Sequence, residues 1–203
     1  MKKRWKLNRT NKEAGEVLVR EFNILPLTAQ LLVNRGLVET DKAFSFLRPD
    51  LKDLHDPFLF KDMDRAVLRI DSAIRDRERI VIYGDYDVDG TTSTALMRLF
   101  FREIGVDAGC HIPERLADGY GLNARTIKRL AGEGVTLIIT VDCGSSNTEE
   151  VKFANTLGVD VIVTDHHEMP DEPPPACAIL NPKQKGCGFP FKGLAGVGVA
   201  FNL

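Results

Sequence analysis

The sequence has few of the features that mark a secreted, membrane-bound or disulfide-stabilised protein. It contains four cysteines among 203 residues, none of them in a CxxC pair. No apolar run approaches the roughly 20 residues that a membrane-spanning helix needs. The basic N-terminus, MKKRWKLNRTNKEAG, has no apolar core and is therefore not a secretory signal. We expect a cytoplasmic protein without membrane attachment.

An excess of positive charge is also missing. Lysine and arginine total 27 against 29 aspartates and glutamates, so the net charge of −2 provides no general field that attracts nucleic acid. A polyanion would have to be bound by a local patch or through metal ions. A zinc site made of Cys177, Cys187 and nearby histidines is disfavoured, because the tight ligand spacing of such sites is missing.

What the sequence does contain is a regular alternation of apolar strands and amphipathic helices after residue 60. The expected strands are 79–84, 108–113, 136–141, 159–164 and a short one at 179–180; the expected helices are 61–77, 91–104, 123–132 and 147–157. The strands are apolar throughout, as expected when helices cover both faces of a parallel sheet. The predicted fold class is therefore α/β, with a doubly wound, mostly parallel sheet.

Residues 1–60 lack this alternation. Their pattern predicts small helices at 13–22, 27–36 and 40–47, the second opened by Pro26 and ended by Gly36, and a loop over 50–60. We expect a helical and irregular N-terminal segment, 1–60, followed by a domain over 61–203. The last stretch of that domain, GLAGVGVAFNL, is expected to be a glycine-rich turn that enters an apolar helix.

Acidic residues follow the first strand of the domain. The stretch VIYGDYDVDGTTST has Asp85, Asp87 and Asp89 at alternate positions, so an extended backbone would direct all three to one side. Packing three carboxylates together is costly unless cations neutralise them, and such a set suits Mg²⁺ or Mn²⁺. The alternative is a solvated acidic turn or helix cap, where Asp is also favoured.

Two later strands also end in residues that bind metals. Asp142 follows one of them, and Asp165-His166-His167 follows the next. The carboxyl ends of parallel strands meet at one edge of the sheet, so these residues should converge. Consecutive residues on an extended strand point to opposite sides, so we expect one histidine to bind metal and the other to contact substrate or carry a proton. The three strand ends together predict a two-metal hydrolase.

Four segments in this order, YGDYDVDGTTSTAL, VDCGSS, VTDHHEMP and GLAGVGVAF, resemble the DHH phosphoesterase superfamily. With IPERLADGYGLN they are similar in particular to its single-stranded-DNA-specific exonucleases, from about residue 60 to the end. The resemblance implies 5′-to-3′ hydrolysis of single-stranded DNA by a two-metal mechanism with Mn²⁺ or Mg²⁺, in DNA repair and recombination. Single-stranded DNA is the implied partner, with a helicase and single-strand-binding protein as candidate protein partners.

The resemblance also implies site residues. The metal ligands that it implies are Asp85, Asp87, Asp89, Asp142 and His166, with Asp142 as the bridging ligand and Asp85 as either a ligand or a supporting group. The implied catalytic residues are His167, Asp142 and Asp89, and His167 is expected to touch the scissile phosphate. Asp165 is expected to orient His166 or its backbone.

Two residues of the segment after the second strand are candidates for substrate binding. Arg115 is expected at the same sheet edge as the acids and suits bidentate phosphate binding, with an ion pair to Glu114 or Asp118 as the alternative. Tyr120 is a candidate for stacking on a base, although the glycines beside it also indicate a shape role.

One feature of the superfamily is missing. Its pattern has a further metal-binding aspartate beyond the GLAGVGVAF helix, and the sequence ends at Leu203, before that position. The domain is therefore expected to be the truncated N-terminal part of a larger exonuclease, and this chain alone is a candidate for an inactive form. The alternatives are a phosphodiesterase for short oligonucleotides or cyclic dinucleotides, and a catalytically inactive DNA-binding scaffold.

Overall fold

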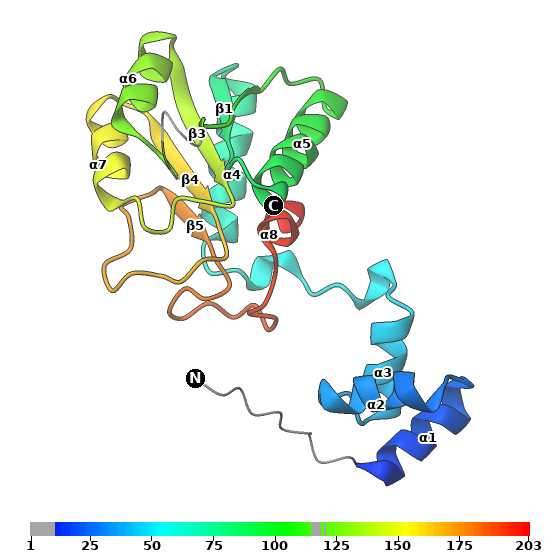
Figure 1. Cartoon of the computed structure of the whole chain (residues 1–203). Coiled ribbons are helices and arrows are strands. Elements are labelled where there is room, and N and C mark those ends of the chain that lie inside the picture. The colour runs from blue at the N-terminus through cyan, green and yellow to red at the C-terminus, as the bar shows by residue number, and fades with distance from the viewer. Residues whose placement is uncertain (1–10, 115–118, 120) are drawn as a thin grey trace. The chain divides into compact units, whose positions relative to one another are not determined.

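A computed structural model describes residues 11–114, 119 and 121–203 (Figure 1). The chain divides into two compact units, Met1–Leu54 and His55–Leu203. The first unit has one buried apolar cluster, and the second has two.

The first unit is a group of short helices. It contains α1 (Lys12–Phe22), α2 (Pro26–Asn34), α3 (Thr40–Leu47) and the 3₁₀ turn η1 (Leu51–Asp53). The side chain of Asn11 caps α1 by accepting a hydrogen bond from the N–H of Ala14. The three small helices expected from the sequence are thus confirmed. The loop expected over 50–60 contains two 3₁₀ turns, η1 and η2 (Pro57–Leu59), because Asp50 and Asp56 each cap one.

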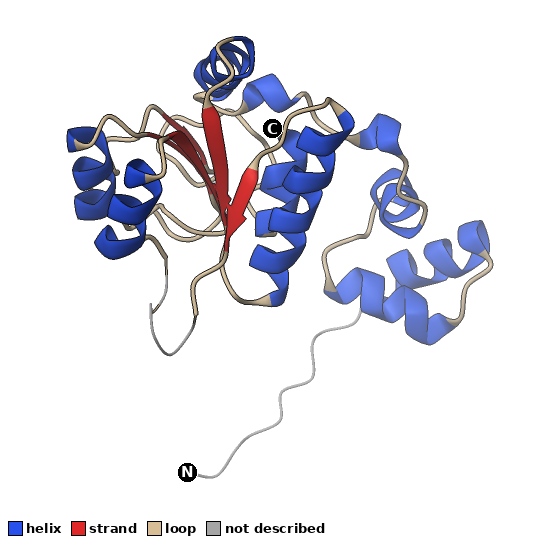
Figure 2. Cartoon of the chain, turned by 90° about the horizontal axis from the view of Figure 1, so that it is seen from above, coloured by secondary structure: helices blue, strands red, loops and turns tan. Residues whose placement is uncertain are grey.

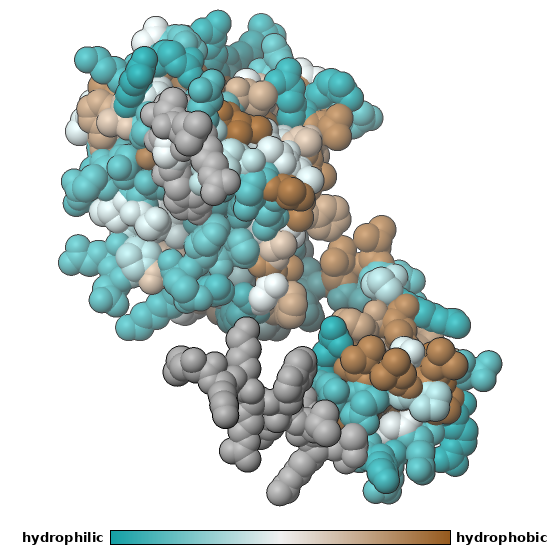
Figure 3. Space-filling view, in the orientation of Figure 1, coloured by the Kyte–Doolittle hydropathy of each residue, from teal (hydrophilic) through white to brown (hydrophobic). Residues whose placement is uncertain are grey.

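The apolar surface of this first unit is only partly buried. Its core consists of Leu18, Ala29, Leu32 and Ala43. Several large apolar side chains remain exposed, among them Leu25, Leu27, Phe44 and Phe46, and Figure 3 shows apolar side chains gathered on the visible face of this unit. A unit of three short helices has too little volume to enclose its apolar side chains.

The second unit is built on a five-stranded parallel sheet. Its strands are β1 (Arg79–Tyr83), β2 (Gly109–His111), β3 (Val135–Val141), β4 (Asp160–Thr164) and β5 (Ala178–Leu180), in the spatial order β2-β1-β3-β4-β5. Every neighbouring pair is parallel. The chain order reverses at β1, so the sheet is doubly wound, as predicted.

Helices cover both faces of this sheet (Figure 2). The helices are α4 (Met63–Arg75), α5 (Val88–Glu103), α6 (Ala124–Gly132), α7 (Thr148–Thr156) and α8 (Gly196–Asn202). Ile80 and Ile82 of β1 pack in one cluster with residues of α4, α5 and α8, whereas Val81 and Tyr83 pack in the other with residues of α6 and α7. This period-two division explains why the strands are apolar throughout.

Several expected element boundaries differ from those of the structure; the expected helix 61–77, for example, spans only Met63–Arg75. Helix α5 begins at Val88, three residues before the expected start, because the carboxylate of Asp87 accepts a hydrogen bond from the N–H of Gly90 and caps the helix there. Strand β2 spans only Gly109–His111, since it pairs with β1 over three residues.

The four cysteines are all free thiols, and no cysteine among the described residues joins a group able to bind a metal. Among the described helices, none combines the length and the hydropathy of a membrane-spanning segment.

A polar network ties together the amino ends of three strands. Arg69 on α4 contacts Glu78, which directly precedes β1, at 2.7 Å and Asp160 of β4 at 2.6 Å. Thr136 of β3 donates its hydroxyl to the same Glu78 carboxylate. The side chains of Arg69 and Glu78 are only 19% and 21% exposed, so their bonds are partly shielded from water.

Replacing Arg69 by methionine is expected to lower the free energy of unfolding of the second unit by about 1–3 kcal/mol at neutral pH, because Glu78 loses its main partner. The hydrogen bond from Arg69 lowers the pKa of Glu78 below its ordinary value of 4.5. The stabilisation is therefore present above pH 4.5 and is lost as the pH falls through the lowered pKa. Urea unfolding at neutral and acidic pH should show a weaker acid dependence in the variant.

The control for this experiment is Arg75→Met, whose ion pair with Asp71 is well exposed at both ends. Its free energy of unfolding should change by less than about 0.5 kcal/mol. Equal losses in the two variants would contradict a special role for the Arg69 network.

Candidate metal centre

Acidic and histidine side chains converge at the carboxyl ends of β1, β3 and β4. Asp85, Asp87 and Asp89 follow β1, and Asp142 follows β3 directly. His166 and His167 follow β4 after Asp165. The three strands are neighbours in a parallel sheet, so their carboxyl ends lie at the same edge.

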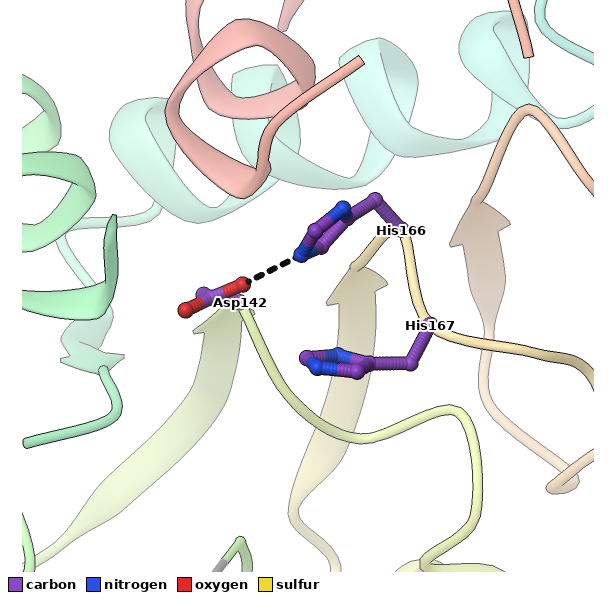
Figure 4. Close-up of side chains that lie close together, drawn as sticks. All are labelled: Asp142, His166 and His167. Atoms are coloured by element: carbon purple, nitrogen blue, oxygen red, sulfur yellow. Dashed lines mark ion pairs between the residues drawn. The ribbon is translucent and has the colours of Figure 1, made fainter. Parts of the chain in front are cut away.

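Asp142 is the residue that these side chains share. One ligand atom each from Asp142, His166 and His167 lies within 4.8 Å of the others, and the same holds for Asp85, Asp87 and Asp142. The Nε2 atom of His166 is 3.1 Å from Oδ1 of Asp142, and Figure 4 shows both imidazole rings beside this carboxylate. Asp142 therefore belongs to two potential metal-binding groups at once.

The surroundings of Asp142 disfavour its negative charge when no cation is bound. Its side chain is nearly inaccessible to water, and this burial, followed by the carboxylates of Asp89 and Asp87, raises its pKa from 3.8 to about 8. A cation that bound among these oxygens would remove the repulsion. Carboxylates combined with imidazole suit Mn²⁺ and related ions, so the donor set fits a divalent cation.

The backbone of Asp142 has an unusual conformation. Its φ of 63° lies in the left-handed region, which residues other than glycine seldom adopt and which recurs at functional sites. The N–H of Asp142 donates to the carbonyl of Thr164 at 3.0 Å, which fixes this turn against the end of β4. The conformation turns the chain away from the strand direction immediately after β3.

The three acids after β1 converge in a different way from the one expected. Strand β1 ends at Tyr83, and Asp89 lies in the first turn of α5, so an extended alternation does not direct them. Asp85 is buried, Asp87 is exposed, and Asp89 is partly buried. A turn between strand and helix thus brings Asp85 and Asp87 to Asp142, and the expectation of one extended segment is wrong.

Asp89 is held by a helix more than 100 residues away in the sequence. Its two carboxylate oxygens accept hydrogen bonds from the N–H groups of Gly196, at 2.6 Å, and Val197, at 2.7 Å. Its Oδ2 is also 3.6 Å from Nε2 of His166. Gly196 lies so close to Asp142 that an added Cβ would come 2.8 Å from that residue's Cβ and Cγ. The start of α8 therefore packs directly against two of the acids.

The two histidines lie on the same side of the chain, contrary to the expectation of opposite sides. Their ring centroids are 4.6 Å apart (Figure 4). The reason is that β4 ends at Thr164, so the alternation of an extended strand does not apply to residues 166 and 167.

Asp165 holds His167 in place. Its Oδ1 is 2.7 Å from Nδ1 of His167, and it also accepts hydrogen bonds from the backbone N–H groups of His166 and His167. Asp165 therefore orients the backbone of His166, as expected, but the ring that it contacts is that of His167. Hydrogen bonds from His167 and Ser145 outweigh the effect of burial and lower the pKa of Asp165, and the same contact raises the pKa of His167.

Two candidates for substrate binding, Arg115 and Tyr120, lie outside the described residues. The sequence also did not single out Asn181 and Ser145, which bond to each other and to the residues around Asp165. Asn181 follows the short apolar strand β5, so its place at a fourth strand end was the available signal.

Comparisons with known proteins all point to one family. Residues 79–203 match the family described as "DHH family, N-terminal domain". The chain is 45% identical over 202 residues to the single-stranded-DNA-specific exonuclease RecJ of Bacillus subtilis, covering 100% of this chain and 26% of that protein. It is 38% identical to RecJ of Escherichia coli, covering 100% of this chain and 34% of that protein.

Two solved structures that resemble this chain are also structures of RecJ. The structure of RecJ from Thermus thermophilus in complex with Mn²⁺ superposes with a TM-score of 0.74 at 29% identity, over 97% of this chain and 27% of that one. A structure of exonuclease RecJ bound to manganese gives a TM-score of 0.65 at 36% identity, over 70% of this chain and 36% of that one. The chain thus spans roughly a quarter to a third of the curated relatives considered.

Proposed function

The chain belongs to the DHH family, and from this membership we propose that the gene product carrying it is a metal-dependent exonuclease that hydrolyses single-stranded DNA. The observation that carries the proposal is the convergence of carboxylates and imidazoles on Asp142. It is supported by similarity to single-stranded-DNA-specific exonucleases along the whole length of the chain.

Mn²⁺ or Mg²⁺ is the proposed cofactor, with two ions in the complete protein. Asp142 takes part in both groups of donors, which suits a ligand that bridges two ions. The residues proposed to hold the ions are Asp85, Asp87, Asp89, Asp142 and His166. When bound, the two cations would activate water and stabilise the attacking and leaving oxygens of the phosphodiester. The manganese in the two similar RecJ structures supports this choice of metal.

His167 is proposed to contact the scissile phosphate. Its Nδ1 is committed to Asp165, so a substrate would meet the ring at Nε2. In the protein without metal, the hydrogen bond to Asp165 raises the pKa of His167. An imidazolium can pair with a phosphate oxygen and pass a proton to the leaving oxygen. Arg115 and Tyr120 remain proposed contacts for the phosphate and a base.

The 5′-to-3′ direction, the role in DNA repair and recombination, and a cytoplasmic location belong to the same proposal. They rest on the resemblance to the single-stranded-DNA exonucleases of the family. A helicase and single-strand-binding protein are the proposed protein partners.

The test is digestion of long single-stranded DNA, labelled at either end, by the complete gene product. We expect mononucleotides to be released from the 5′ end in Mn²⁺, with activity lost in excess chelator and restored when Mn²⁺ is added back. Mn²⁺ at about 100 times its Kd should also stabilise the fold by about 2.7 kcal/mol, seen as a higher Tm.

The alternatives give different results in the same experiment. Hydrolysis of dinucleotides or cyclic dinucleotides, but not of long strands, would assign the chain to the small-substrate phosphodiesterases of the family. DNA binding without any metal-dependent hydrolysis would identify an inactive scaffold.

A further inference from the structure

A buried polar residue lies at the end of β5. Asn181 is 0% exposed, and its amide nitrogen donates to the hydroxyl of Ser145 and to the backbone carbonyl of His167, both at 2.9 Å. Its amide oxygen accepts from the N–H of Lys183, also at 2.9 Å. A buried amide is costly unless it is hydrogen-bonded, and here both of its ends are used.

Ser145 extends this network to the residue that holds the His167 ring. Its N–H donates to Oδ2 of Asp165 at 2.9 Å, while Oδ1 of Asp165 contacts Nδ1 of His167 at 2.7 Å. Ser145 and Asp165 are each only 1% exposed. His167 is therefore held from two directions, at its carbonyl by Asn181 and at its N–H and ring by Asp165.

We propose that Asn181 is a positioning residue, which holds the imidazole of His167 at the metal centre without touching the substrate. The inference rests on the proposed exonuclease function. His167 lies beyond the last residue of β4, so the ladder bonds of the sheet do not fix its backbone. Asn181 supplies this restraint from the neighbouring strand, and through Ser145 it also restrains the carboxylate that orients the ring.

The expected consequence is a loss in turnover rather than in binding. The Asn181→Ala variant loses the contact to the His167 carbonyl but keeps every proposed metal ligand. A misplacement of about 1 Å at a reacting group can cost about 100-fold in rate. We therefore expect kcat to fall by about 10- to 100-fold, while KM for single-stranded DNA and the Kd for Mn²⁺ change less than about threefold.

A double-mutant cycle in the complete gene product tests the proposal. It compares Asn181→Ala, His167→Ala and the double variant, with kcat, KM and the Mn²⁺ affinity measured for each. If Asn181 acts through His167, the double variant should be no slower than His167→Ala. A further loss of kcat in the double variant, equal to that of Asn181→Ala alone, would overturn the proposal. So would a wild-type kcat in Asn181→Ala.

The control is Asn155→Ala. The amide of Asn155 also donates to a backbone carbonyl, that of Pro175 at 2.9 Å, but the residue is exposed on α7. Its kcat should match the wild type. If Asn181→Ala does not fold, Asn181→Ser takes its place, since the shorter side chain also loses the contact to the His167 carbonyl. The same pattern in the cycle is then expected, and its absence would overturn the proposal.

A spectroscopic measurement separates this proposal from the proposed function. NMR of the protein with ¹⁵N-labelled histidine, without metal or DNA, should show a protected Nδ1–H of His167 that becomes exchangeable in Asn181→Ala. An unchanged signal would overturn the positioning role even if the enzyme is active. A protein that hydrolyses no DNA would instead defeat the proposed function, and activity that survives His167→Ala would defeat only the proposed phosphate contact of His167. In both cases the NMR result would still decide whether Asn181 positions the ring.

Discussion

Replacing Asp142 by asparagine is expected to abolish metal-dependent hydrolysis, with a loss of about 10³-fold or more in kcat. Asp142 is the residue shared by both potential metal-binding groups, so one substitution removes a ligand from each. Stabilisation by bound metals is worth several kcal/mol, and each 1.4 kcal/mol changes a rate about tenfold. Nuclease assays in Mn²⁺ measure the loss of kcat, and calorimetric titration of Mn²⁺ measures the loss of metal affinity.

The same substitution is expected to stabilise the protein when metal is absent. The pKa of Asp142 is raised from 3.8 to about 8, so the folded state holds a proton that the unfolded chain has released over that interval. The free energy of unfolding therefore falls as the pH rises through this window, and the full cost is reached above about pH 8. Asparagine cannot ionise and avoids this cost, which is of the order of a few kcal/mol.

Thermal unfolding in excess chelator, measured across this pH range, shows whether Asp142→Asn stabilises or destabilises the metal-free protein. The Tm of Asp142→Asn should exceed that of the wild type by an amount that grows toward pH 8, and saturating Mn²⁺ should reverse the order. The control is Asp171→Asn, an exposed residue whose substitution should leave both Tm and kcat unchanged. A variant that is less stable than the wild type in chelator at alkaline pH would contradict the assigned electrostatics.

The second large effect is expected from Gly196→Ala. The added methyl group would lie 2.8 Å from Cβ and Cγ of Asp142, far closer than carbon atoms pack, so α8 or Asp142 must move. Movement of α8 would also break the hydrogen bonds from Gly196 and Val197 to Asp89. We expect a loss of about 100-fold or more in kcat and a weaker affinity for Mn²⁺, because two proposed ligands are displaced together.

Helix propensity cannot explain such a loss, because alanine is a better helix former than glycine. The matched control is Gly132→Ala at the end of α6, where an added Cβ meets no atom within 4 Å. It should leave kcat and the Mn²⁺ affinity unchanged. Wild-type activity in Gly196→Ala would mean that α8 does not determine the geometry of Asp89 and Asp142.

The fold class could be predicted from the sequence because its signal is local. Continuous apolar runs such as Leu137-Ile138-Ile139 predict strands buried on both faces, and the helices between them require parallel pairing. The convergence on Asp142 could also be predicted, since residues that follow neighbouring parallel strands meet at one edge. Those inferences need only the order of elements and the residue at each strand end.

The tertiary structure decided where each side chain lies at that edge. The sequence pattern could not tell that α5 begins at Val88 or that β2 spans only Gly109–His111, because a helix cap and the pairing with β1 determine those ends. The pairing of Asp89 with Gly196 and the contact of Asn181 with His167 join residues far apart in the sequence. Periodicity carries no information on such contacts, since they depend on how whole helices and strands pack.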